Sequence, residues 1–213
     1  MEFDLLAGLG EADRRAVLAV AVRRRYKRGD IIFHADDPGD SFHLLAKGRV
    51  AIRVGTPAGD VATLTVLGVG QGFGEQALLS VESRRSATAV ALEPAETLRL
   101  GHADFDELRA RQPTVERLLL DHVAGQVRRL SEQLVEALYL PAEKRVLRRL
   151  LELDELYDGG EIALTQDDLA SMAGTTRPTA NRVLQGVVAD GLVAVARGKL
   201  DVVDRGALAQ RAR

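Results

Sequence analysis

The sequence predicts an α+β chain in three successive parts: a small β-roll, one long helix, and a C-terminal domain made of a helix pair and a β-hairpin. Three observations support this fold class. Turn signals recur at short intervals between residues 25 and 100, an apolar stripe runs through residues 114–139, and two short helical segments near residue 174 precede a glycine-centred hairpin. Short strands at such spacing are typical of small rolls and barrels. We place the three parts at residues 1–111, 112–140 and 141–213.

The first part begins with an apolar-periodic segment that predicts a helix over residues 11–22. Strands are expected from residue 25 to residue 100, separated by turns such as residues 27–30 and 47–49, which combine glycine with charged residues. A short helix is expected over residues 102–111. The first part therefore reads as a roll of short strands bordered by helices.

Composition excludes several classes of protein. The chain has no cysteine, which removes disulfides, thiolate-held clusters and cysteine nucleophiles. The four histidines are far apart, so no zinc site is expected. We find no nucleophile–base pair and no phosphate-loop or dinucleotide glycine pattern, so an enzyme is not expected. No apolar run approaches membrane-spanning length and the chain start lacks a signal-peptide charge pattern, which predicts a cytoplasmic protein without a membrane partner.

Residues 72–89 carry the most informative site pattern. Glycine allows the backbone to approach a ligand closely, Glu75 can accept hydrogen bonds from a ribose hydroxyl, and Arg85 can grip a phosphate in bidentate fashion. Ser86 adds a hydroxyl, and residues 75–79 read as one helical turn whose N-terminus favours an anion. The alternative is a surface hairpin with an ordinary salt bridge. The candidate ligand-binding residues here are Gly74, Glu75, Gln76, Ala77, Arg85, Ser86 and Ala87.

Residues 114–139 predict a helix of more than six turns, because apolar side chains recur every three or four residues from Val115 to Leu138. A helix of this length at the end of a small roll has little of its own domain to pack against. Burial against a second copy in a parallel coiled coil meets that need and predicts a homodimer. The alternative is a helix that packs on its own β-roll.

A proline at position 141 ends the long helix. A second amphipathic helix is expected over residues 142–157 and a short strand over residues 161–164. Thr165 and Asp168 form a capping-box pattern that opens a further helix, and Gly174 supplies the turn that ends it. Thr176 is expected to cap the next helix, with a proline in its first turn.

Two short helices joined by a glycine turn form a helix-turn-helix, and the hairpin at residues 192–203 resembles a wing. An unspecialised α-hairpin is the alternative. The net charge of the chain is −2, so any nucleic-acid surface must be local. Residues 171–200 contain such a patch. This segment has four basic residues, Arg177, Arg182, Arg197 and Lys199, and one acidic residue, Asp190.

We call residues 72–89 the cassette. Taken together, the cassette, the long helix and the winged helix-turn-helix resemble the CRP/FNR family of bacterial transcription regulators over nearly the whole chain. The resemblance implies a cyclic-nucleotide-binding β-roll, cAMP as the effector, and double-stranded DNA, a second copy of the chain and RNA polymerase as partners. Glu75 matches the ribose contact and Arg85 with Ser86 the phosphate clamp. Leu130 and Ser131 fall where cAMP-responsive members place a threonine and a polar residue against adenine; Ser131 fits, whereas Leu130 cannot hydrogen-bond the purine amine.

The resemblance also assigns DNA contacts. Arg177 and Arg182 match the two arginines of the family's recognition helix, and either can bind guanine through O6 and N7. Pro178 stands where the cAMP-receptor type has a glutamate that reads cytosine, so a different half-site is expected. Asn181 can pair with adenine or contact phosphate. The full candidate set is Thr176, Arg177, Pro178, Thr179, Asn181, Arg182, Arg197 and Lys199.

Three functions are therefore compared. The first is a DNA-binding regulator controlled by cAMP. The second is a member of the same family that binds DNA without an effector or with a different one, which Leu130 favours. The third is a regulatory subunit that binds cAMP and a protein partner, which the winged helix opposes.

Overall fold

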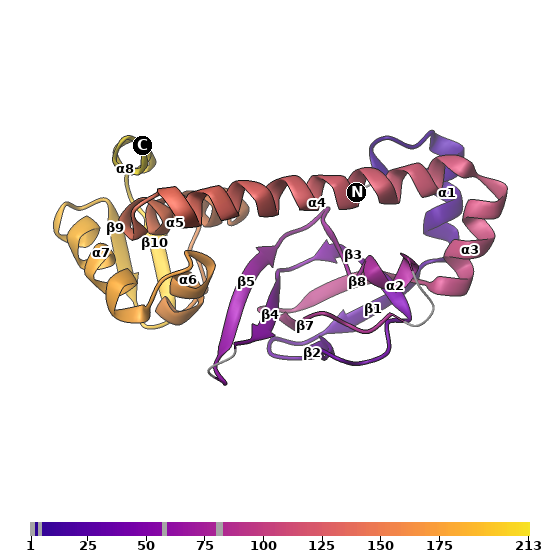
Figure 1. Ribbon diagram of the computed structural model, residues 1–213, viewed down its shortest axis with the longest axis horizontal. Coiled ribbons are helices and arrows are strands. Elements are labelled where there is room, and N and C mark those ends of the chain that lie inside the picture. The colour runs from indigo at the N-terminus through magenta and orange to yellow at the C-terminus, as the bar shows by residue number, and fades with distance from the viewer. Residues whose placement is uncertain (1–2, 4–5, 57–58, 80–82) are drawn as a thin grey trace. The chain divides into compact units, whose positions relative to one another are not determined.

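The computed structural model describes residues 3, 6–56, 59–79 and 83–213. By its internal contacts the chain divides into two compact units, residues 1–54 with 66–129 and residues 130–213 with residues 55–65. Figure 1 labels the helices and strands of both units. Within the described ranges, no helix combines the length and the apolar character that crossing a bilayer requires.

The predicted β-roll is confirmed as two four-stranded sheets. The first has the order β1-β8-β3-β6 and the second the order β2-β7-β4-β5. The core between them draws on both sheets, with Leu45 and Phe73 from the first and Val50 and Ala89 from the second all nearly inaccessible. The strands are β1 (Val22–Tyr26), β2 (Ile31–Phe33), β3 (Ser41–Lys47), β4 (Val50–Gly55), β5 (Val61–Leu67), β6 (Gly72–Phe73), β7 (Thr88–Ala91) and β8 (Ala95–Gly101).

Helices border the roll. They are α1 (Glu11–Val20), the single turn α2 (Gln76–Leu79), α3 (His102–Arg111) and the first half of α4 (Pro113–Tyr139). The prediction of a helix to residue 22 is wrong by two residues, because Val22 already pairs with Arg99 as the first residue of β1. A second apolar cluster joins Phe42 of β3 to Phe105 of α3 and Leu119 of α4.

The apolar stripe of α4 has two different environments. Val115 and Leu119 are 2% and 4% exposed and pack into the cluster with α3, as the own-roll alternative expects. Farther along, Leu130, Leu134 and Leu138 are 63%, 59% and 67% exposed. The stripe therefore covers the roll over its first half and presents an open apolar face over its second half.

The second unit contains α5 (Ala142–Leu156), α6 (Gln166–Met172), α7 (Arg177–Ala189), β9 (Val193–Ala196), β10 (Lys199–Val202) and α8 (Arg205–Ala212). The predicted winged helix-turn-helix is confirmed, and Thr165 and Asp168 form the predicted capping box. The strand expected over residues 161–164 is wrong: only Ile162 makes a β-bridge, to Leu200. The helix α8 was not among the elements expected from the sequence pattern.

Arg145 braces the junction between α4 and α5. Its guanidinium donates to the carbonyl oxygens of Leu140 at 2.7 Å and Ala137 at 3.4 Å, which end α4. It also donates to the carbonyls of Ala173 at 2.8 Å and Gly174 at 2.9 Å, which end α6. These oxygens have no partner within their own helices, since the last carbonyls of a helix lack one. One side chain therefore satisfies the ends of two helices at once.

We expect Arg145→Ala to destabilise the second unit by about 1–3 kcal/mol, because carbonyls in a partly buried junction lose a charged donor. Arg148→Ala is the matched control. Arg148 lies one turn later on α5, its side chain is 38% exposed, and its ion-pair partner among the described residues is Glu136, so its loss should cost less than about 1 kcal/mol. Urea unfolding of the full chain, followed by circular dichroism, measures both. Equal losses in the two variants would contradict the role given to Arg145.

Candidate functional site

The cassette predicted at residues 72–89 connects β6, the single turn α2 and the start of β7. Gly74 begins the turn with φ +81°, a backbone conformation that favours glycine. A Cβ atom at this position would lie 2.6 Å from a guanidinium nitrogen of Arg85. Glycine is therefore required here by the backbone and by the arginine beside it.

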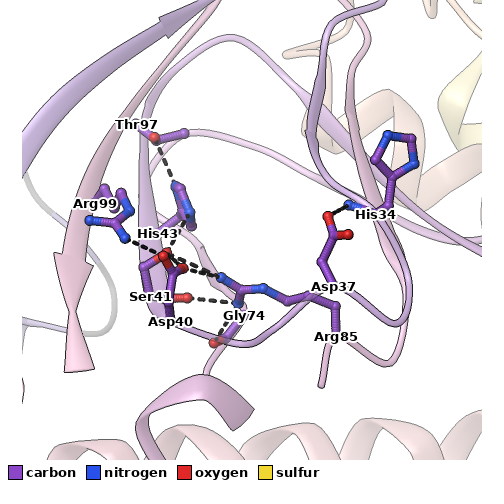
Figure 2. A network of polar contacts seen from close by, with 9 residues as sticks. All are labelled: His34, Asp37, Asp40, Ser41, His43, Gly74, Arg85, Thr97 and Arg99. Carbon is purple, nitrogen blue, oxygen red and sulfur yellow. Dashed lines mark hydrogen bonds and ion pairs between the residues drawn. The ribbon is translucent and has the colours of Figure 1, made fainter. Parts of the chain in front are cut away.

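Arg85 is buried in the first unit, with 6% of its surface exposed. Figure 2 shows its guanidinium inside a polar network. One terminal nitrogen donates to the carbonyl of Ser41 at 2.7 Å and of Gly74 at 3.3 Å. The other donates to the Ser41 hydroxyl at 3.1 Å and to the Asp40 carboxylate at 3.3 Å. The guanidinium carbon lies 4.1 Å from the centre of the Phe33 ring.

Asp40 connects this network to β8, since its second carboxylate oxygen accepts from Arg99 of that strand at 2.6 Å. Burial acts to raise the pKa of Asp40, but the hydrogen bond from Ser41 and the charge of Arg99 outweigh it and hold the pKa below its usual value. Burial lowers the pKa of Arg85, and Asp40 acts in the opposite direction. The two groups are therefore a charged pair.

His43 lies next to this pair and stays neutral. Burial, followed by the positive charges of Arg85 and Arg99, lowers its pKa to about 3. Its ring stacks on Phe73 with the centres 5.2 Å apart, and its Nδ1 lies 3.1 Å from the Thr97 hydroxyl. A neutral ring in this position adds no charge to the site.

One polar group in the network lacks a hydrogen-bond partner among the residues that the structure describes. The Nε atom of Arg85 is buried and makes no hydrogen bond in the part of the chain that the structure describes. A buried donor without an acceptor is costly, so such a group is a candidate contact for a ligand oxygen. An anion that reaches Arg85 meets a positive charge in a dehydrated setting, where charge-assisted hydrogen bonds are strong.

The other predicted cassette residues differ in how far they are exposed. Glu75 is mostly covered, with 12% of its side chain exposed. Gln76 and Ser86 are exposed, whereas Ala77 and Ala87 are buried. The segment therefore supplies a carboxylate, a buried guanidinium and an accessible hydroxyl, which together can bind a ligand that has both hydroxyl and phosphate groups.

Sequence reasoning missed the residues that hold Arg85. Asp40 and Ser41 follow a Pro-Gly pair, a pattern that indicates a turn and not a binding site. It also missed His122 of α4, whose Nε2 atom lies 4.0 Å from a carboxylate oxygen of Glu75. No local pattern marks these residues, because each is far from the cassette along the chain. Leu130 and Ser131, the predicted adenine contacts, lie on the exposed surface of α4.

The candidate DNA-reading element is the pair α6 and α7, joined at Gly174, where φ is +58°. Ala173, Ala180 and Leu184 are buried where the helices pack. Thr176 occupies the capping position of α7, but the predicted side-chain cap is wrong. Its hydroxyl instead lies 3.1 Å from that of Thr179, which leaves both groups at the start of α7.

Basic side chains are exposed at the start of α7 and on the wing. Arg177 pairs with Asp167 at 3.2 Å and Lys199 with Glu161 at 2.7 Å, both at accessible positions. Such surface pairs are weak and easily exchanged for phosphate. Arg182 and Arg197 form no ion pair with any described residue.

Asn181 lies deeper than the arginines and its amide nitrogen donates to Gln166 of α6 at 2.8 Å. Pro178 is exposed in the first turn of α7. The start of α7 therefore presents cations and an amide, and the carboxylate that pairs with Arg177, Asp167, belongs to α6.

Comparison with known proteins agrees with both halves of this description. The model of the cyclic nucleotide-binding domain matches residues 23–112, and the model of the Crp-like helix-turn-helix domain matches residues 144–211. The cyclic AMP receptor protein of Thermus thermophilus is 34% identical over 198 residues, 93% of this chain and 91% of the relative. The CRP-like cAMP-activated global transcriptional regulator of Mycobacterium tuberculosis is 28% identical over 198 residues, which are 88% of this chain and 87% of the relative.

Solved structures agree as well. The catabolite activator protein of Thermus thermophilus has a TM-score of 0.58 at 34% identity, covering 98% of this chain and 97% of its own. The solved structure of a putative cAMP-binding regulatory protein from Silicibacter pomeroyi has a TM-score of 0.71 at 27% identity, and the match covers 99% of this chain and 94% of that protein. With two domain models in the same order and a relative at this identity over nearly its full length, the chain belongs to the CRP/FNR family of transcription regulators.

Proposed function

We propose that the protein is a homodimeric, sequence-specific DNA-binding regulator whose DNA affinity is set by cAMP. The observation that carries the proposal is Arg85: a buried guanidinium with one donor lacking a partner, beside Gly74 and Glu75. In this function the cyclic phosphate binds Arg85 and Ser86, and the ribose hydroxyl donates to Glu75. RNA polymerase is the partner through which the DNA-bound protein changes transcription.

Phosphate binding at Arg85 requires exchange of partners. The guanidinium already has acceptors in Ser41, Gly74 and Asp40. An arginine has five N–H donors in a planar, fixed arrangement. A phosphate can therefore accept from Nε–H and from one terminal N–H, while the backbone carbonyls continue to accept from the remaining N–H groups. Asp40 retains Arg99 as a partner throughout, so the exchange leaves no carboxylate unpaired.

The second half of α4 supports the dimer. Its apolar residues are more than half exposed at Val127, Leu130, Leu134 and Leu138. The first three have the spacing of three and then four residues that a parallel coiled coil uses, and Leu138 lies beside the next position of that seam. The same face on a second copy buries them symmetrically. In the dimer Leu130 and Ser131 lie at this contact, where the family places its adenine-binding pair.

The start of α7 supports major-groove binding. A recognition helix contacts base edges with its N-terminal residues, and Arg177 and Arg182 are exposed there. Two copies would place these helices in successive major grooves about 34 Å apart. Nucleotide binding would change how the two α4 helices meet. The junction at Leu140–Pro141, which Arg145 braces, would transmit the change to the helix pair.

Leu130 favours a second function, that of a regulator with another effector or none. Its side chain is 63% exposed and has no hydrogen-bonding group. An adenine amine facing it would lose a partner that a threonine supplies. Glu75, Arg85 and Ser86 oppose this alternative, since they retain the parts that bind ribose and phosphate.

Replacing Arg85 tests the proposed pocket. Arg85→Ala should weaken cAMP binding by about 2–5 kcal/mol, because a charge-assisted bidentate contact to the phosphate is lost. Arg85→Lys keeps the positive charge but cannot make the bidentate contact, so its loss of cAMP binding free energy should be smaller than that of Arg85→Ala. Isothermal titration calorimetry of the folded variants with cAMP measures both.

Arg84→Ala is the matched control. Arg84 is the adjacent arginine, is exposed, and donates only to the carbonyl of Asp36 at 2.7 Å among its described contacts. It should bind cAMP as the wild type does. If Arg85→Ala also titrates like wild type, the phosphate is bound elsewhere and the pocket assignment is wrong.

The DNA half-site should contain a guanine read by an arginine, and it should not need the C·G pair that the family's glutamate reads. Pro178 has no acceptor for a cytosine amine. Arg182→Ala should cost about 1–3 kcal/mol and relax selection at one base pair. Selection from a random DNA pool, with wild type and variant, measures the preference at each position.

Arg197→Ala provides the comparison for that experiment. Arg197 lies on the wing and is expected to contact phosphate, so its loss should weaken binding to all sequences equally and reduce the salt dependence. If Arg182→Ala behaves in this uniform way too, Arg182 is a phosphate contact. Recovery of the unmodified cAMP-receptor consensus with both proteins would contradict the roles given to Pro178 and Arg182.

A further inference from the structure

Glu75, which the proposed function assigns to the ribose, lies beside a histidine of the long helix. The Nε2 atom of His122 is 4.0 Å from a carboxylate oxygen of Glu75, and the two side chains are only 13% and 12% exposed. Both belong to the first unit. The carboxylate that would receive the ribose is therefore covered on one side by α4.

The protonation state of His122 can be inferred from its neighbour Gln126. The amide nitrogen of Gln126 lies 3.1 Å from the same Nε2 atom. An amide nitrogen only donates, so Nε2 must accept and carries no proton, and the neutral ring has its proton on Nδ1. With no proton between them, Nε2 and Glu75 are near each other but not hydrogen-bonded.

The surroundings of His122 favour this neutral form. Burial is the main reason that its pKa lies below the usual value; Glu75 acts to raise the pKa and Arg129, on the same helix, acts to lower it. From β3, Phe42 contributes an uncharged ring whose centre is 6.0 Å from that of the histidine. Glu75 and Arg129 are thus the charged groups whose influence on His122 is resolved among the described residues.

We propose that His122 is a positioning residue of the cyclic-nucleotide site: the neutral ring leaves the Glu75 carboxylate free for the ribose hydroxyl, and the imidazolium takes that carboxylate for itself. This inference rests on the proposed function of the cassette. It follows from the position of Nε2 between two partners. Without a proton, Nε2 accepts from Gln126; with a proton, it can donate to Glu75. A single protonation state does not allow both. The contact links the ribose carboxylate to the helix that carries the dimer face.

The sign of the pH effect follows from this exchange. Protonated His122 competes with the ribose for Glu75, and a nucleotide that covers the site makes the buried charge still less favourable. The pKa of His122 is therefore lower in the nucleotide-bound protein than in the free protein. By linkage, cAMP affinity is constant above the free-protein pKa and falls as the pH drops below it, by at most about tenfold per pH unit. Because that pKa is lowered, the fall begins below the ordinary histidine value of about 6.5.

The test is isothermal titration calorimetry of the full chain with cAMP from about pH 7.5 to about pH 5. Below the pKa of His122 in the free protein, the affinity of the wild type should fall by up to about tenfold per pH unit, and His122→Gln should remove this fall. Because the same ligand is used, its own titration cancels between the two proteins. His102→Gln is the matched control: His102 lies on α3 and pairs with Asp106 at 3.0 Å, so this variant should keep the wild-type pH profile.

A second variant moves the profile in a known direction. Arg129→Gln removes a positive charge that acts to lower the pKa of His122 and adds no rival carboxylate, so the loss of cAMP affinity should begin at a higher pH than in the wild type. This variant keeps the histidine and remains informative if His122→Gln does not fold.

Two outcomes separate this inference from the proposed function. If the wild type binds cAMP at about pH 7.5 but shares its pH profile with His122→Gln, or if Arg129→Gln moves the profile to lower pH, the role of His122 is wrong and the cassette assignment stands. If the wild type does not bind cAMP at that pH, the proposed function fails and this inference fails with it.

Discussion

A charged guanidinium inside the β-roll constrains much of the first unit. Burying an arginine without partners would cost several kcal/mol, so the fold must surround it with acceptors. The carbonyls of Ser41 and Gly74 and the carboxylate of Asp40 meet this need. The same constraint fixes a glycine at position 74, where a Cβ atom would collide with the guanidinium. A phosphate that binds here meets a charge that is already held in place, so little ordering remains to be done on binding.

The long helix connects this site to the rest of the molecule because its two halves have different partners. Its first half closes the core of the roll with Val115 and Leu119 and brings His122 next to Glu75. Its second half leaves an apolar face open and ends at a junction held by Arg145 and by Glu136, which accepts from Arg149 at 2.6 Å. A change at the nucleotide would reach the helix pair through one continuous element, provided that the two states of the helix bind the nucleotide with different affinity.

The sequence predicts the order of the elements well because their signals are local. The capping box at Thr165, the proline that ends α4 and the glycine turn at Gly174 each act over a few residues. Prediction from the sequence fails where contacts between residues far apart in the chain determine the structure. The helix that begins at residue 11 stops early because β8 pairs with Val22, and the apolar stripe alone does not reveal that only its second half is open. In the site, Arg85 is predictable from its motif, whereas its partners Asp40 and Ser41 are brought to it only by the fold.

The central claim, that a cyclic nucleotide and DNA bind to linked states of this protein, is tested most directly by two calorimetric titrations. One adds cAMP to the protein alone, and the other adds it to the protein bound to its selected DNA site. Because coupling is reciprocal, cAMP should bind the DNA complex more tightly by the same factor by which cAMP tightens DNA binding, typically about 5- to 150-fold. Equal cAMP affinities with and without DNA would contradict the account, and would leave a DNA-binding protein that cAMP does not control.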